Sequence, residues 1–396
     1  MKVATSWSTS QGAQAIDSAY QALFDQLGAT PSFLVLSCTT DHDPDTLLQV
    51  LHQQISNTPL IGATSCLGVM TQSGFHGENG SGLGLYGMLD TDGNYGVGAA
   101  AIGDDPRQAA KQAVSKALIQ ANCPGEVPAM IWMSAAPGHE EALIEGIADV
   151  LGSEVPVAGG SAADNTVSGE WRQFANDESF SDAVVVAALF PSTEIIYAFH
   201  SGYEPTELKG IATKTEGRLL KEIDGKPAAK IYDQWAGGII NNSLKGGGNI
   251  LADTTLQPFG RVAGYIGKIP YYQLSHPDTV TRDGGLTLFT DIEQGEELIL
   301  MRGSPDSLIS RAGRVASSAL DTYNAKADDV AGALVIYCAG CMLTVQSRID
   351  EVVSSVCDVL PETPFLGAFT FGEQGCFIGG ENRHGNLMIS HILFLK

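Results

Sequence analysis

The clearest pattern of hydrophobic and polar positions lies in residues 332–375 and predicts a strand, a helix and a second strand. Residues 333–337 form a short apolar run with β-branched side chains, as is typical of a buried strand. Residues 348–360 carry apolar side chains at the three- and four-residue spacing of a helix. Pro364 then opens another apolar run, which ends at Gly367.

Two earlier stretches, residues 32–65 and 129–161, repeat this pattern. Each of the three copies ends in Pro-x-x-Gly, followed within three residues by Ser65, Ser161 or Thr370. A strand, a helix and a strand so closely spaced predict right-handed βαβ units, and hence a mixed α/β fold with mixed sheets. Small residues behind such strands let the backbone or a ligand approach their carboxyl ends. The alternative is that these glycines only form turns.

The rest of the pattern predicts two domains, residues 1–200 and residues 201–396. The first is expected to contain two of the βαβ units. Within it, residues 171–174 and 183–190 predict two strands that pair with each other. In the second, residues 245–249 contain three consecutive glycines and predict a flexible loop or a domain joint.

The composition narrows the classes of partner. The chain has 22 Lys and Arg against 45 Asp and Glu, a net charge of −23, so a surface for nucleic acid or for an anionic membrane is not expected. We find no apolar run long enough to span a membrane and no signal-peptide pattern, and the seven scattered cysteines fit a reducing compartment. We therefore expect a cytoplasmic protein. A basic protein partner, a small ligand and a homodimer stay open.

Motifs of catalysis are not found. The sequence has no serine elbow, no paired metal-binding histidines and no dinucleotide fingerprint, and the glycine-rich residues 74–87 lack the Lys-Ser/Thr of a phosphate loop. We therefore do not expect an enzyme. Cys338 and Cys341 form a CxxC pair at the end of a predicted strand. They are interpreted as buried thiols, as a redox pair, or as part of a metal site completed by Cys376 or Cys66.

Two histidines are candidates for a binding site. His200 ends a predicted strand and is followed by Gly202, Tyr203 and Pro205, an arrangement that directs side chains into a pocket. His276 follows a tyrosine-rich run and precedes a proline. Both also fit the ordinary interpretation of a histidine satisfied within the core. A haem needs only one axial nitrogen and an apolar cleft, so no long motif would reveal it.

The chain resembles the FIST family of bacterial sensory proteins, which carry an N-terminal and a C-terminal FIST domain. The resemblance covers nearly the whole length and rests on several short elements. These are Pro59–Ser65, Gly159–Asp164, His200–Pro205 with Asp224–Ala228, Tyr337–Gly340, and Pro364–Gly375. Many members have Arg directly after Cys-Ala-Gly, where this chain has Cys341.

Stand-alone members of this length are similar to the NosP type, which senses nitric oxide through haem, and His200 at the junction fits that subgroup. This resemblance implies haem b held by His200 as the metal ligand, with Tyr203, Pro205 and His276 near the cofactor. It also implies signal transduction to a partner histidine kinase, in a two-component system, or to a cyclic di-GMP enzyme, and so control of biofilm formation. The alternative within the family is a haem-free receptor for a small ligand such as an amino acid, held at Ser65, Ser161 and Thr370.

Overall fold

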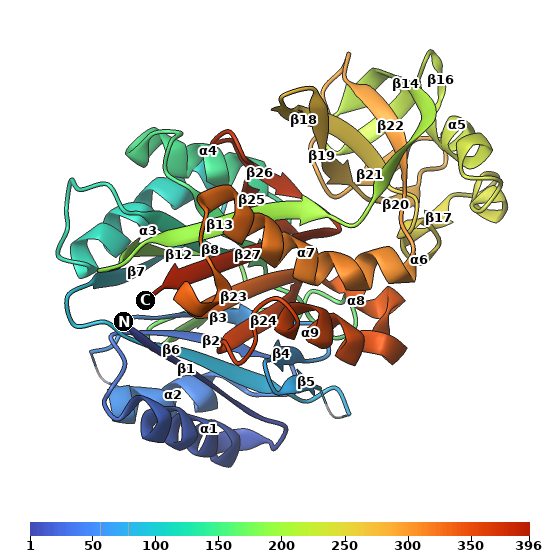
Figure 1. The fold of residues 1–396 in the computed structure, drawn as a ribbon. Coiled ribbons are helices and arrows are strands. Elements are labelled where there is room, and N and C mark those ends of the chain that lie inside the picture. Colours follow the sequence, from blue (N-terminus) through green and yellow to red (C-terminus); the bar gives the residue numbers. More distant parts are fainter. Residues whose placement is uncertain (56, 78) are drawn as a thin grey trace.

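The computed structural model describes residues 1–55, 57–77 and 79–396 and has two parts (Figure 1). Residues 1–203 and 303–396 form the larger part, which we call the body, and residues 204–302 form the smaller part, the cap. The chain enters the cap on β14 (Glu204–Glu216) and leaves it on β22 (Glu297–Arg302), and these two strands are antiparallel neighbours.

The first sheet of the body has the strand order β1-β6-β2-β3-β10-β11. Its strands are β1 (Lys2–Ser8), β2 (Phe33–Cys38), β3 (Leu60–Thr64), β6 (Leu83–Leu89), β10 (Gln173–Ala175) and β11 (Glu178–Phe180). Helices α1 (Gly12–Leu27) and α2 (Pro44–Ile55) bury their apolar stripes against one face. The α1 helix ends at Gly28, whose φ of 79° favours glycine.

The second sheet has the order β26-β25-β9-β8-β12-β7 and therefore mixes strands from distant parts of the chain. Its strands are β7 (Asn94–Ala101), β8 (Met130–Ala135), β9 (Val157–Ser161), β12 (Ala183–Phe190), β25 (Glu373–Cys376) and β26 (Asn382–Gly385). Helices α3 (Pro106–Gln120) and α4 (Glu140–Leu151) pack together and cover its outer face.

The third sheet has the order β13-β27-β23-β24-β4-β5. Its strands are β4 (Val69–Thr71), β5 (Gly74–His76), β13 (Ile195–Ser201), β23 (Val330–Cys338), β24 (Phe365–Thr370) and β27 (Met388–Leu395). Helices α7 (Pro305–Tyr323) and α9 (Ile349–Cys357) cover it. Shorter helical elements are η2 (Ala327–Asp329), α8 (Ala339–Thr344) and η3 (Gln346–Arg348).

The cap is built on a nine-stranded sheet with the path β17-β20-β21-β15-β14-β22-β18-β19, on which β16 pairs with β15. Its further strands are β15 (Leu219–Ile223), β16 (Lys226–Pro227), β17 (Gly248–Asn249), β18 (Phe259–Ile266), β19 (Ile269–Ser275), β20 (Pro277–Val280) and β21 (Leu286–Leu288). Its helical elements are α5 (Ala228–Trp235), η1 (Asn241–Ser243) and α6 (Leu251–Thr254). A small separate core holds this part together.

The three predicted βαβ units are confirmed. In each, the two strands are parallel neighbours: β2 with β3, β8 with β9, and β23 with β24. One apolar core contains residues from all three units, so the sheets pack on one another through their inner faces while the helices lie outside. The Pro-x-x-Gly glycines do more than form turns. A Cβ at Gly62 would lie 2.2 Å from the Leu36 carbonyl oxygen, and one at Gly159 would lie 1.9 Å from that of Met133.

One strand pairing predicted from the sequence is wrong. Residues 171–174 and 183–190 do not pair with each other: β10 pairs with β3 and β11, whereas β12 lies between β8 and β7. The reason is that β10 and β11 form a short hairpin on the first sheet, and the chain then crosses to the second. The expected boundary between residues 200 and 201 stays a prediction. In the part of the chain that the structure covers, no helix is long and apolar enough to cross a membrane.

Candidate functional site

A cavity of about 750 Å³ lies between the body and the cap. Pockets of this volume are typical of sites for small molecules and cofactors. The body contributes residues that follow β8, β23 and β24, the strands of the second and third βαβ units, so the carboxyl ends of these strands face the cavity. The cap contributes α6, the start of β20 and the hairpin before β15.

Most of the cavity wall is apolar. The aromatic side chains of Trp171 and Phe371 meet edge to face, with ring centroids 6.1 Å apart. The cap supplies Leu251 and Phe289. The polar side chains of the wall include Glu140, Arg218, Asn249, His276, Thr370 and Asn386. An apolar cavity with a few convergent polar groups is suited to bind a small ligand in a defined orientation.

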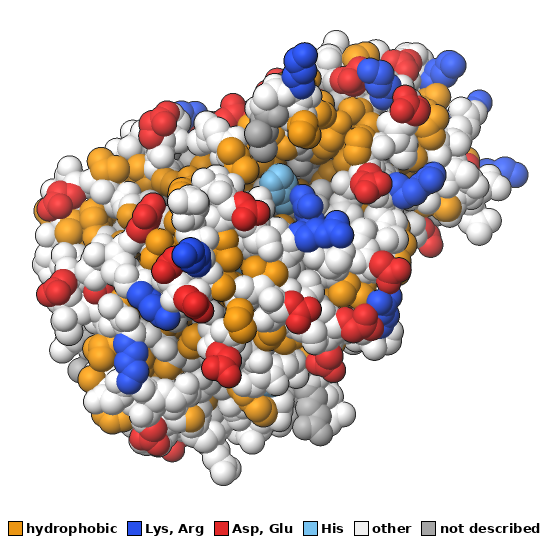
Figure 2. Space-filling view, viewed as in Figure 1, with side chains coloured by type: hydrophobic (Ala, Val, Ile, Leu, Met, Phe, Trp, Pro, Cys, Tyr) orange, Lys and Arg blue, Asp and Glu red, His pale blue; other side chains and the backbone are white. Residues whose placement is uncertain are grey.

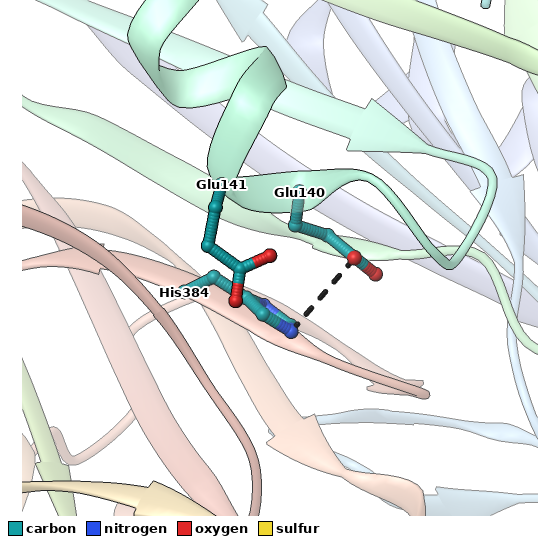
Figure 3. Close-up of side chains that lie close together, drawn as sticks. All are labelled: Glu140, Glu141 and His384. Carbon is teal, nitrogen blue, oxygen red and sulfur yellow. Dashed lines mark ion pairs between the residues drawn. The ribbon is translucent and has the colours of Figure 1, made fainter. Parts of the chain in front are cut away.

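One end of the cavity is closed by an ion-pair cluster between body and cap. Arg218 Nη2, from the cap, lies 2.7 Å from Glu140 Oε2 and 2.6 Å from Glu141 Oε2, at the start of α4. The Ser161 hydroxyl donates to Glu140 Oε1 at 2.7 Å. The Asp291 backbone N–H donates to Glu141 Oε1 at 2.8 Å. His384, on β26, completes the group, with its Nε2 3.9 Å from Glu140 Oε2 (Figure 3).

The cluster fixes the charges of its members. Burial alone would raise the pKa of Glu140, but the charges of His384 and Arg218 and the hydrogen bonds from Ser161 and Arg218 outweigh burial and lower it to about 2. The pKa of Glu141 is lowered in the same way. Burial would lower the pKa of Arg218, but both carboxylates raise it. The pair is therefore ionised at neutral pH although Glu140 is buried.

The same residues offer three metal ligands, because atoms of Glu140, Glu141 and His384 lie within 4.8 Å of one another. The guanidinium of Arg218 already contacts both carboxylates, however, and supplies the positive charge that a metal ion would bring. This arrangement is that of an ion pair joining two parts of a protein. The Nη1 atom of Arg218 makes no hydrogen bond to any described residue and is left for a ligand.

The structure brings one of the two candidate histidines to the cavity. His276 lines it; its Nε2 lies 3.1 Å from the Leu251 carbonyl oxygen, which leaves Nδ1 for a ligand. Burial lowers its pKa to about 4, so the ring is neutral at pH 7. His200 is not among the lining residues. It lies on β13, where burial first and the charge of Arg311 next lower its pKa to about 4.

The two other residues implied by the resemblance also lie outside the cavity wall. Tyr203 is buried, and its hydroxyl donates to the Thr255 carbonyl oxygen at 2.8 Å. This bond ties the end of β13 to the cap next to the cavity. Pro205 is exposed on β14, opposite Met301 of β22.

The CxxC pair lies at the floor of the cavity. Cys338 is the N-cap of α8 and lines the cavity, and Cys341 is fully buried one turn later. The hydroxyl of Tyr203 lies 3.7 Å from Cys341 Sγ. Burial, and next the neighbouring Cys341, raises the pKa of Cys338, which makes it a poor nucleophile. No triad of metal-ligating atoms in the described ranges includes either cysteine. These features favour buried thiols.

The site contains residues that sequence reasoning missed. Analysis of the sequence identifies neither Glu140, Glu141 nor Arg218 as a site residue. The pairing of Arg218 with Glu140 joins residues far apart in the chain and had no local signal. Of the three hydroxyls proposed to hold a ligand, Thr370 lines the cavity, Ser161 lies one hydrogen bond behind it, and Ser65 bonds instead to the Gly68 carbonyl at 2.6 Å.

Two protein-family models match most of the chain. The model of the FIST N domain matches residues 32–226, and that of the FIST C domain matches residues 228–376. An uncharacterized protein of Methanocaldococcus jannaschii is 36% identical over 88 residues. That match covers 22% of this chain and only 17% of the relative.

Two solved structures show distant likenesses to the chain. The cyanuric acid hydrolase of A. caulinodans has a TM-score of 0.40 and 9% identity, covering 100% of this chain and 99% of that one. A second cyanuric acid hydrolase has a TM-score of 0.36 and 9% identity, covering 99% of each chain.

Proposed function

Since the chain belongs to the FIST family, whose two domains mark sensors of signal transduction, we propose that it is a sensor that binds a small organic ligand in the cavity between body and cap. The observation that carries the proposal is the cavity itself: about 750 Å³, mostly apolar, and lined from both parts of the molecule. We propose no catalytic step. The sensor acts by binding and by a change in its contacts with a partner.

The polar groups of the cavity define the class of ligand. Arg218 Nη1 is suited to the carboxylate of a small organic ligand such as an amino acid. The apolar wall of Trp171, Leu251 and Phe289 accepts its side chain. This arrangement agrees with a haem-free receptor, although two of the three hydroxyls expected to hold the ligand do not line the cavity.

A ligand that touches both parts changes the balance of body–cap arrangements. Only its differential affinity for those arrangements shifts their populations. The two parts share an apolar core that includes Leu274 and Met301 of the cap. Polar contacts between them include Arg218 with Glu140, Tyr203 with Thr255, and His384 Nε2 with the Phe289 carbonyl at 3.0 Å. We propose that a ligand redistributes these contacts. The surface so changed is then recognised by a histidine kinase or a cyclic di-GMP enzyme.

One observation favours a second candidate, a haem-based nitric oxide sensor: the cavity contains a neutral histidine with one nitrogen left for a ligand. The residues present fit haem b if His276, rather than His200, holds the iron and Arg218 meets a propionate. Bound haem would supply an iron site for nitric oxide. The chain itself would contribute the imidazole, the apolar walls and the link from the cavity to the body–cap contacts.

The test is a thermal-shift screen of the protein with amino acids, with haem, and with haem plus nitric oxide. We compare Ala252→Trp, at an exposed cavity position, with Ala13→Trp, at an exposed position on α1. A ligand of the cavity stabilises the wild type and Ala13→Trp but not Ala252→Trp, by an amount that grows with ligand concentration. Stabilisation that survives Ala252→Trp would refute the cavity as the site.

Absorption spectra separate the two candidates. A Soret band that shifts with nitric oxide, is lost in His276→Ala and is kept in His200→Ala would favour the haem sensor with His276 as ligand. Loss of the Soret band in His200→Ala alone would favour His200 as the iron ligand and contradict the placement of haem in this cavity. Stabilisation by an amino acid without any Soret band would favour the haem-free receptor.

A further inference from the structure

The helix α7 covers a second group of side chains whose hydrogen-bonding capacity is unused. Arg311, on α7, makes no ion pair or hydrogen bond with any residue that the structure describes, and its Nε is buried without a partner. Carboxylates are not scarce, because the chain has 45 of them against 22 Lys and Arg. Other arginines do find carboxylate partners: Arg107, Arg218, Arg261, Arg348 and Arg383.

Two histidines lie on adjacent strands beneath this part of α7. His200 on β13 is opposite Ile389 of β27, and His391 on β27 is opposite Ala198, so both rings are on the same face, at diagonal positions. Burial first, and the charge of Arg311 next, lower the pKa of His200. His391 is fully buried, and the carbonyl of Ala312 is close enough to affect its pKa, yet neither ring nitrogen makes a hydrogen bond of normal geometry.

These side chains share a lack of hydrogen-bond partners. Burial lowers the pKa of Arg311, and the neighbouring charge of Arg314 lowers it further. A buried donor without a partner costs free energy, and a charged one costs more. A guanidinium and two imidazoles together offer several N–H donors and no carboxylate to receive them. The missing component is an acceptor with negative charge.

We propose that Arg311, His200 and His391 form a binding site for a small oxyanion, a carboxylate or a phosphate. Arg311 and His200 are half-buried and provide access, whereas His391 forms the floor. Figure 2 shows a pale-blue histidine side chain beside blue side chains near the junction of the two parts. The net charge of −23 disfavours a strongly acidic macromolecule here, so a small ion is the expected occupant.

This site is distinct from the cavity, because none of its three residues lines the cavity wall. It therefore does not depend on the proposed function. Binding here would neutralise the charge beneath α7 at the end of β13, two residues before the chain reaches Tyr203 and the cap.

The test is calorimetric titration of the whole protein with inorganic phosphate and, separately, with acetate, at constant ionic strength maintained with chloride. In parallel, NMR of ¹⁵N-labelled arginine follows the Arg311 Nε–H signal. We expect one oxyanion to saturate with a dissociation constant of about 1 mM or tighter. The Nε–H signal should shift along the same curve. Saturation by phosphate alone or by acetate alone would identify which of the two sources fits.

The variants are Arg311→Met, which keeps the apolar stem, and Arg314→Gln as a matched control on the exposed side of the same helix. Arg311→Met should weaken binding at least about tenfold, because a charge-assisted hydrogen bond is lost. Arg314→Gln removes a charge that also acts on Arg311, and should weaken binding much less than Arg311→Met. Should Arg311→Met fail to fold, the wild-type titration still decides. The absence of saturation by both ions, or equal binding by both variants, would overturn the proposal.

Discussion

Replacing Arg218 by Met tests whether the ion-pair cluster joins the body to the cap. The side chain of Glu140 is 2% exposed, and that of Arg218 is 21% exposed. The variant therefore leaves a buried carboxylate beside Glu141 without its cation. Removal of one partner from a buried pair is strongly destabilising, since the remaining charge is uncompensated.

The size of the expected loss in unfolding free energy follows from the pKa of Glu140. Its neighbours lower this pKa from 4.5 to about 2. A difference of this size between folded and unfolded states is worth about 3 kcal/mol of unfolding free energy at pH 7. His384 and Ser161 share in the shift, so Arg218 accounts for part of it. The loss of Arg218 also raises the free-energy cost of keeping Glu141 ionised. We expect Arg218→Met to lower the free energy of unfolding by about 2–3 kcal/mol.

The pH dependence gives a second measurement. Because the folded pKa of Glu140 is below the unfolded value, its contribution is present above pH 4.5 and is lost as the pH falls toward 2. In Arg218→Met the pKa of Glu140 rises toward its unfolded value. The variant therefore loses less unfolding free energy than the wild type as the pH falls. Urea denaturation should therefore show the full deficit at pH 7 and a smaller one at pH 3. Adding Glu140→Gln to the variant should restore part of the stability.

The matched control is Arg107→Met, the same change at an ion pair whose arginine side chain is 49% exposed. Its denaturation midpoint should move little, because solvent screens such pairs. If Arg218→Met costs no more than Arg107→Met, or if its deficit is the same at pH 7 and pH 3, the account of this cluster is wrong.

Two further predictions concern the body. Burial first, and Cys338 next, raises the pKa of Glu373 above 4.5, so its folded form keeps a proton that the unfolded chain releases as the pH rises. Glu373→Gln should be more stable than the wild type at pH 8, by on the order of 1 kcal/mol, and should lose this gain at pH 4. A urea midpoint lower than that of the wild type at pH 8 would contradict this prediction. A Cβ at Gly313 would lie 2.0 Å from the Ser355 carbonyl oxygen, between α7 and α9. Gly313→Ala should therefore cost about 1–3 kcal/mol in a thermal melt, against little for Ser318→Ala on the same helix, and equal melting temperatures would refute the close contact.

The repeated units of the body could be predicted because their signals are local. Apolar runs, helical spacing and Pro-x-x-Gly lie within about 35 residues of one another in each unit, a distance over which a crossover is tightly constrained. The glycines of these elements also have a local cause, since Gly62 and Gly159 each pack against a carbonyl of the neighbouring strand. Fold class and the three parallel strand pairs follow from such patterns.

The site could not be predicted to the same extent, because its parts meet through long-range packing. Nothing near Arg218 in the sequence indicates Glu140, and nothing near His276 indicates that it faces the same cavity as Cys338. His200 ends a strand as expected, but the side of the sheet it faces is fixed by pairing with β27, almost two hundred residues later. A strand pattern indicates alternation and cannot say which face the cavity adjoins.

The position of β27 has a consequence for how quickly the protein folds. This strand lies between β13 and β23, in the interior of its sheet, although it follows both of them in the chain. Until residues 388–395 have left the ribosome, one edge of each neighbour lacks its partner, and both neighbouring strands carry mostly apolar side chains. Unpaired edges of this kind are prone to pair with other chains. We expect slow folding governed by distant contacts, and a nascent chain that depends on chaperones until this strand is in place.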